Sequence, residues 1–369
     1  MLEYIGIKRF KTLLDVNFPL NSLNVFSGLN GMGKSSVIQV LLLLRQSYEK
    51  NALASKGLLL NGDYVHLGTG VDALSISGDT DTINFIFKWQ ESVESINFDF
   101  GYEQDSDLLP IIDFHADTEF SSLSLFNNHF RYLDADRLGP QNNHQLSEYH
   151  IRDLNSLGNH GEYTVHFIAM NGLNDLNISH LQHKNAVAGT LLANIEAWMS
   201  DISPGIRIKA TAQPKFNSAT LSYSFVQGNE TTSEFKPQNV GFGLSYVLPV
   251  VTSILSAKYG DMLIIENPES HLHPAGQAVM GRLCALAAHN GVQLIIESHS
   301  DHFLNGVRVA VKDDIISSDK VALFFLQRSS EANNHASNVI YPKIDSDGRI
   351  DQWPEGFFDE WDNQLDRLL

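Results

Sequence analysis

The chain has 369 residues and is therefore long enough for one large domain or two moderate ones. Because 43% of its residues are hydrophobic, it can form a sizeable core, which argues against disorder over most of its length. Its 43 acidic side chains outnumber 25 lysines and arginines, giving a formal charge of −18. Such a surface repels phosphate backbones on average, so DNA is a possible partner only through a local contact.

The amino-acid pattern also predicts where the protein works. Cys284 is the single cysteine and stands in an apolar run, so it is expected to be a buried hydrophobe without a disulfide, as in a reducing cytosol. Acidic Glu3 stands where an export signal would be basic, and no segment reaches about 18 uninterrupted apolar residues. We therefore expect a cytoplasmic protein with no membrane contact.

The amino-terminal part predicts strands around one helix. Apolar residues alternate between Leu2 and Phe26, which is typical of antiparallel strands leading into a glycine-rich turn. Residues 35–48 are apolar almost all round, as expected of a helix in the middle of a fold. Residues 83–89 and 96–102 predict a further strand pair.

The middle of the chain is less regular. Between residues 104 and 206 the periodicity weakens and polar residues become common, which indicates an inserted lobe. Only residues 186–199 predict a helix there. The absence of a sustained heptad pattern argues against long coiled-coil arms.

The last third returns to regular order. Buried-strand runs at 262–265, 292–296 and 321–326 are separated by helical stretches, including 274–289, which predicts a parallel sheet covered on both faces. An acidic and aromatic tail, 353–369, is expected to pack as a helix. The predicted class is α/β, with a mixed sheet, an antiparallel β subdomain and a partly helical lobe. The predicted segments are 1–103, 104–206, 207–328 and 329–369.

A phosphate-binding motif follows the first strands. Residues Gly28–Ser35 read GLNGMGKS, which matches the P-loop pattern at every fixed position, between a predicted strand and a predicted helix. Glycine-flanked backbone N–H groups and a helix N-terminus bind phosphate, the lysine bridges the β- and γ-phosphates, and the serine hydroxyl binds Mg²⁺. The predicted ATP-binding residues are Asn30, Gly31, Gly33, Lys34, Ser35 and Ser36.

Acidic residues end the strand that begins at Met262. Residues 261–269 read DMLIIENPE, the form of a Walker B segment, and Glu266 takes the metal-side role together with Ser35. The next strand ends at Glu297-Ser298-His299, which predicts His299 at the same edge of the sheet, where ligands of α/β sheets gather.

Other roles for these polar residues remain open. Ser300 or Asp301 would cap the following helix, and this role is compatible with His299 at the nucleotide. For His271 and His273 we favour a structural or interface role over zinc, because Glu269 is the only further ligand nearby.

Together these segments resemble the ABC-type ATPases of the RecF, SMC and overcoming-lysogenisation-defect classes, and most of all the stand-alone bacterial AAA family ATPases with a C-terminal domain of unknown function. The strongest likeness lies in segments 28–36, 240–249, 263–274 and 297–308, and weaker likeness in 132–140 and 353–360. The resemblance implies an ATPase head that forms a homodimer around two ATP molecules, with the P-loop of one subunit facing a signature helix of the other.

The resemblance also assigns the signature. Gly241-Phe242-Gly243-Leu244-Ser245 resembles that motif, and Gly241, Gly243 and Ser245 are its predicted ATP contacts; an ordinary helix start is the alternative. Arg137 is placed near the interface by the resemblance, with a salt bridge as the alternative.

One position departs from the pattern. Related ATPases usually place a second acid after the metal-side carboxylate, but this chain has Asn267, whose amide orients water without accepting its proton. Either Glu269 substitutes as the base or hydrolysis is slow. The predicted catalytic residues are Glu266, Asn267, Glu269 and His299.

Three functions fit this pattern. The first is a Mg-ATP-driven dimeric switch with a separate protein effector, which the resemblance links to DNA processes or defence against phage. The second is a nucleotide-sensing regulatory or scaffold subunit with little hydrolysis, which Asn267 favours. The third is a P-loop kinase, which would require an arginine-bearing lid.

Overall fold

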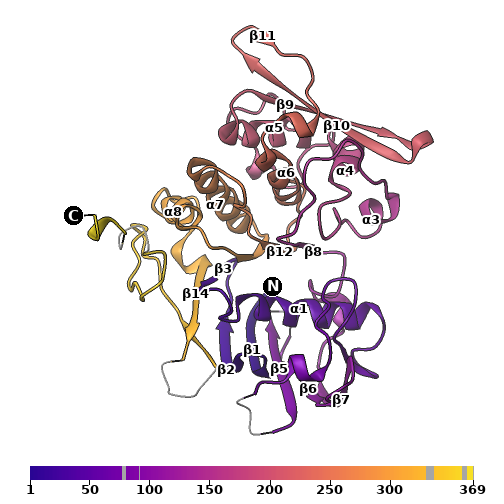
Figure 1. Cartoon of the computed structure of the whole chain (residues 1–369), viewed down its shortest axis with the longest axis vertical. Coiled ribbons are helices and arrows are strands. Elements are labelled where there is room, and N and C mark those ends of the chain that lie inside the picture. The colour runs from indigo at the N-terminus through magenta and orange to yellow at the C-terminus, as the bar shows by residue number, and fades with distance from the viewer. Residues whose placement is uncertain (77–79, 91, 330–335, 360–363, 369) are drawn as a thin grey trace. The chain divides into compact units, whose positions relative to one another are not determined.

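A computed structural model of the chain describes residues 1–369 except 77–79, 91, 330–335, 360–363 and 369 (Figure 1). The chain forms two compact units. The first contains Met1–Asn127, Val321–Lys343 and Ile350–Leu369, and the second contains Asn128–Lys320 and Ile344–Arg349. Each unit is therefore built from segments that are distant in the sequence.

The first unit contains an antiparallel sheet. Its strand order is β2 (Leu13–Pro19), β1 (Leu2–Phe10), β5 (Thr82–Trp89), β6 (Ile96–Gly101), β7 (Leu108–His115) and β4 (Gly57–Leu59). Alternate residues are buried, and the Phe85 and Phe100 rings of neighbouring strands lie 5.7 Å apart. The predicted antiparallel strands are confirmed, but β7 lies where no strand was expected.

A second group of strands in this unit leads to the glycine-rich turn. Strand β14 (Val321–Arg328) pairs in parallel with β3 (Leu23–Gly28) and antiparallel with β15 (Ser337–Ile340). Helix α1 (Lys34–Glu49) follows and is buried along nearly all of its length, which confirms the predicted central helix. The unit also contains a short helix, α2 (Gly70–Ala73).

The second unit contains three parallel strands covered by helices. Strand β12 (Met262–Glu266) lies between β8 (Phe130–Leu133) and β13 (Gln293–Glu297). The associated helices are α6 (Phe242–Leu255), α7 (Pro274–His289) and α8 (Asp301–Lys312). Strands β12 and β13 and helix α7 match the predicted elements. Because all three strands run in parallel, their carboxyl ends meet at one edge.

The same unit includes smaller elements that the sequence predicted less well. These are α3 (Glu148–Arg152), α4 (Thr164–Asn171), α5 (Leu191–Ile202), β9 (Ile206–Gln213), β10 (Ser218–Gln227) and β11 (Glu230–Thr231). The helix predicted at 186–199 begins later and ends later, as α5. The segment before it stays irregular because Asn194 donates a hydrogen bond to Ala188 O and accepts one from His183 N.

The carboxyl-terminal tail also departs from expectation. Residues 353–359 form turns and bends and not the predicted helix, residues 364–366 are helical as predicted, and residues 360–363 and 369 lie outside the described part of the chain. Gly356 has a φ of +81°, which breaks a helix, and the Phe357 ring packs 5.3 Å from that of Phe325 on β14. No described helix combines the length and apolar composition needed to cross a bilayer.

Helices α7 and α8 lie side by side because two glycines allow close approach (Figure 1). A Cβ at Gly306 would lie 2.2 Å from the carbonyl oxygen of Ala278, and one at Gly281 would lie 2.2 Å from that of Phe303. Such contacts are far shorter than any van der Waals distance, so each position requires glycine.

We expect Gly306→Ala to lower the free energy of unfolding by about 1–3 kcal/mol, because the added methyl forces the helices apart. This loss must exceed the gain of about 1 kcal/mol that alanine brings to a helix. Val309→Ala, on the exposed side of α8, is the control and should change stability by less than about 0.5 kcal/mol. Equal stability of both variants in denaturant titrations would contradict the close packing.

Candidate functional site

The glycine-rich turn of the first unit is fixed by its own packing. Gly28 ends β3 with a φ of +141°, and a Cβ there would lie 2.1 Å from the carbonyl oxygen of Leu326 on β14. Gly33 precedes α1 with a φ of +92°, and a Cβ there would lie 2.8 Å from Thr12 Oγ1. Both positions therefore require glycine, which keeps the backbone of the turn accessible to a ligand.

Lys34 is the first residue of α1 and is only 4% exposed. Its ammonium folds back onto the turn, where Nζ donates hydrogen bonds to Gly28 O at 2.8 Å and Leu29 O at 2.9 Å. A cation at the positive end of a helix makes this turn a site for anions. Asn30, Gly31 and Ser35 are exposed and Ser36 is buried, so the residues present fit a phosphate group.

Carboxylates gather at one edge of the second unit. Glu266 ends β12 and Glu297 ends β13, and the parallel register places the two residues side by side. Tyr132, from β8, donates a hydrogen bond from its hydroxyl to Glu266 Oε1 at 2.8 Å. Burial, and then the Glu297 carboxylate, raise the pKa of Glu266 to about 7. A divalent cation bound here would relieve this repulsion.

The carboxylates at this edge suit a nucleotide-bound Mg²⁺ and not a metal ion held by protein side chains alone. Within the described residues, no group of three or more His, Cys, Asp or Glu side chains is arranged to hold a metal ion. Nucleotide-bound Mg²⁺ needs only one or two carboxylates, because phosphates and water supply its other ligands. Glu266 fits this requirement.

Glu269 holds the segment that carries His299. Its Oε1 accepts hydrogen bonds from Ser298 Oγ at 2.8 Å and from His299 N at 3.0 Å, and the residue is 6% exposed. The cap of α8 is Ser300, whose Oγ accepts from Phe303 N. The imidazole of His299 thus stays about half exposed, with Nε2 3.8 Å from Glu297 Oε1.

Asn267 adopts a left-handed conformation. Its φ is +45°, and its N–H donates to Glu297 O at 2.8 Å, which joins the ends of β12 and β13. Asparagine tolerates this backbone region better than glutamate does. Its buried Oδ1 has no hydrogen-bond partner among the described residues. Asn267 therefore stands where related ATPases place a second acid, and the backbone conformation of its turn favours asparagine over glutamate.

The predicted signature is the start of α6. Gly241 is exposed and Phe242 is 47% exposed, whereas Ser245 is 9% exposed and lies beside the phenol of Tyr223. Gly243 packs on its own subunit, since a Cβ there would lie 2.4 Å from His271 O. The exposed tip of α6 therefore comprises Gly241 and Phe242, followed by the half-buried Gly243, and the Ser245 hydroxyl is buried.

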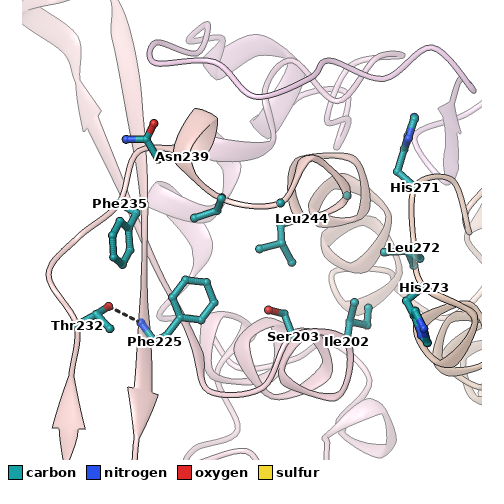
Figure 2. Close-up of a pocket in the computed structure, with 13 residues that line it drawn as sticks. Ile202, Ser203, Phe225, Thr232, Phe235, Asn239, Leu244, His271, Leu272 and His273 are labelled. Atoms are coloured by element: carbon teal, nitrogen blue, oxygen red, sulfur yellow. Dashed lines mark hydrogen bonds between the residues drawn. The ribbon is translucent and has the colours of Figure 1, made fainter.

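A cavity of about 550 Å³ opens beside this tip. Figure 2 shows Phe225 and Phe235 on one side, His271 and His273 on the other, and Leu244 between them. His273 also caps α7, because its Nδ1 accepts from Ala275 N, and His271 packs on the ring of Phe242. Both histidines thus have structural contacts beside the α6 tip.

Two site residues escaped the sequence prediction, and one predicted residue has an unexpected role. Glu297 ends its strand as Glu266 does, so strand alignment could have found it. Tyr132 begins the segment of weaker likeness at 132–140, but its contact with Glu266 depends on the pairing of β8 with β12 and could not be predicted. Arg137, for which an interface role and a salt bridge were both open, donates to the main-chain carbonyls of Glu266 and Asn267.

Comparisons with known proteins agree with this arrangement. The profile described as "AAA domain, putative AbiEii toxin, Type IV TA system" matches residues 23–305. The profile described as "Protein of unknown function (DUF3696)" matches residues 316–368. A search of curated proteins gave no match.

Solved structures of SMC heads have a similar fold. The SmcHead bound to the C-winged helix domain of ScpA is 12% identical, with a TM-score of 0.52 over 93% of this chain and 98% of that one. The Smc head domain with an extended coiled coil, bound to the C-terminal domain of ScpA derived from Pyrococcus furiosus, is 12% identical, with a TM-score of 0.50 over 100% and 99%. The likeness confirms the predicted ABC-type head fold.

The raised pKa of Glu266 predicts a pH-dependent stability in magnesium-free buffer. The folded state keeps the proton up to about pH 7, whereas the unfolded state loses it near the ordinary glutamate pKa of 4.5. This contribution is complete below about pH 4.5 and is lost as the pH rises through about 7, by roughly 3 kcal/mol at most. Unfolding titrations between pH 5 and 8 should show this loss in the parent protein and not in Glu266→Gln.

The control for this titration is Glu148→Gln, which changes an exposed carboxylate of the same unit. It should keep the pH slope of the parent protein. A parent protein whose slope matches that of Glu266→Gln would show that Glu266 is ionised throughout, and the electrostatic account of this edge would be wrong.

Proposed function

The chain belongs to the AAA-domain family of the AbiEii type, and we propose that it is an ATPase that binds Mg-ATP and uses it to switch between two states of a homodimer. The observation that carries this proposal is the buried ammonium of Lys34, held inside a glycine-rich turn at the start of α1. Such a turn is built for a polyphosphate. The carboxylates of Glu266 and Glu297 supply the complementary chemistry for the metal.

In this mechanism, the backbone N–H groups of residues 30–36 and the Lys34 ammonium bind the phosphates. Ser35 and Glu266 would hold Mg²⁺, which neutralises charge on the phosphates when bound. His299 has an accessible imidazole, which is suited to contact the γ-phosphate or the attacking water. Gly241 and Gly243 would present the accessible tip of α6 to the nucleotide of the other subunit.

Two features favour slow turnover. Asn267 cannot accept a proton from water, and Glu269 already accepts two hydrogen bonds from the segment around His299. Its Oε2 is buried and has no hydrogen-bond partner among the described residues, and we propose that Glu269 acts through Oε1 to position His299 and not in proton transfer. The ATP-bound dimer would then be long-lived, which suits a switch.

The same features support a second candidate, a nucleotide-sensing subunit with almost no hydrolysis. It differs from the first in one measurable respect, because ATP would remain intact in the purified dimer. In both cases we propose a cytoplasmic protein with a separate protein effector, by analogy with the SMC heads whose structures contain ScpA domains. A role in DNA-linked processes or in defence against phage is part of this proposal.

Lys34→Ala should abolish ATP binding and phosphate release, with a loss of at least roughly a hundredfold, because it removes the buried cation that the phosphates contact. Lys50→Ala, at the other end of α1 where the ammonium is paired with Asp63, is the matched control and should behave like the parent. Equilibrium binding of labelled ATP, phosphate release and mass measurement with Mg-ATP test this. A Lys34→Ala protein that hydrolyses ATP at the parent rate would refute the proposal.

The role of Glu269 predicts different results for two substitutions. Glu269→Gln keeps an acceptor oxygen for Ser298 Oγ and His299 N, so phosphate release should fall by less than about tenfold. Glu269→Ala removes both hydrogen bonds and should cost about a hundredfold or more. Loss of all turnover in Glu269→Gln, with unchanged thermal stability, would instead identify Glu269 as the base.

A further inference from the structure

Arg137 is a buried arginine that joins three parts of the second unit. Only 1% of it is exposed, and it donates four hydrogen bonds, all to main-chain carbonyls. Nε donates to Tyr246 O at 3.1 Å and Nη1 to Asp134 O at 2.9 Å. Nη1 also donates to Glu266 O, and Nη2 to Asn267 O, both at 2.6 Å. The guanidinium therefore links the segment after β8, helix α6 and the turn after β12.

This geometry requires an arginine. A planar guanidinium directs its donors along fixed directions, so it can serve carbonyls on separate elements at once, whereas an ammonium acts as a point charge. The cation also lies 5.7 Å from the centroid of the Tyr246 ring, which lies 4.9 Å from the Phe242 ring at the tip of α6. Arg137 is thus connected to the tip as well as to the metal-side turn.

We propose that Arg137 is a positioning residue that couples the two nucleotide sites of the dimer. This inference rests on the proposed function, in which Glu266 serves the nucleotide of its own subunit and the α6 tip serves that of the partner. Arg137 fixes the α6 backbone to the Glu266–Asn267 turn, so a shift of one element moves the other. Occupancy of one site would thereby change the geometry of the second.

A second buried arginine provides a matched control. Arg131, on β8, is 3% exposed and bonds the opposite end of α6 through Ser253 O, Ser256 Oγ and Ser256 O. It therefore resembles Arg137 in burial and in tying α6 to the segment around β8. Its hydrogen bonds reach neither Glu266 nor Asn267, so Arg131→Lys tests for a general loss of packing.

The experiment uses heterodimers with one live ATP site. The reference pairs a parent subunit with a Lys34→Ala subunit, so only the parent subunit's turn binds ATP. Arg137→Lys is then added either to the parent subunit, where it affects the metal-side turn of the live site, or to the Lys34→Ala subunit, where it affects the α6 tip that faces that site. Both heterodimers carry the same substitutions in total, and they differ only in their distribution between the chains.

Coupling predicts that both placements lower single-turnover phosphate release by about tenfold relative to the reference. Arg131→Lys in either subunit should leave release within about twofold of the reference, at a similar fall in melting temperature. Loss in only one placement, in neither, or equally with Arg131→Lys would overturn the coupling. A parent homodimer that releases phosphate no faster than the Lys34→Ala homodimer would instead refute the proposed function, and the coupling with it.

Discussion

The parallel register of β12 and β13 is the constraint on which the site depends. It places Glu266 and Glu297 side by side at the end of two buried strands, where desolvation and the Glu297 carboxylate oppose the ionisation of Glu266. A buried like-charged pair persists only where other groups offset it. The hydroxyl of Tyr132 bonds one carboxylate, and a bound cation would neutralise the pair. The unfavourable electrostatic energy at Glu266 therefore lies at the position where a bound metal ion would offset it.

The backbone around these carboxylates is held by polar side chains. Arg137 satisfies the carbonyls of Glu266 and Asn267, and Glu269 satisfies the amide of His299. These contacts satisfy buried main-chain groups that would otherwise destabilise the fold. They also fix the two turns that carry the candidate chemistry. Asn267, in its left-handed conformation, belongs to this framework, which explains how a residue unsuited to proton transfer is accommodated there.

Predictions from the sequence were most accurate for elements that depend on a local pattern of residues. The turn at Gly28–Ser35, the helix at 274–289 and the buried strands all lie where periodicity and spacing placed them. Prediction was weakest between residues 104 and 206, where β7, β8 and the short helices lack a repeating pattern. The helix predicted for residues 353–359 is absent for a related reason, because the packing of Phe357 on Phe325 outweighs local helical preference.

By itself, the sequence determined the phosphate-binding turn, the acidic strand end and the family, because these depend on residue types at fixed short spacings. Only the tertiary structure decided which side chains share an environment. It placed Glu297 beside Glu266, assigned Glu269 to the His299 segment and showed Arg137 bonded to carbonyls and not to a carboxylate. These relations arise from strand register and from hydrogen bonds between residues 30 or more positions apart in the chain. Short-range patterns carry no information about which distant groups must satisfy each other.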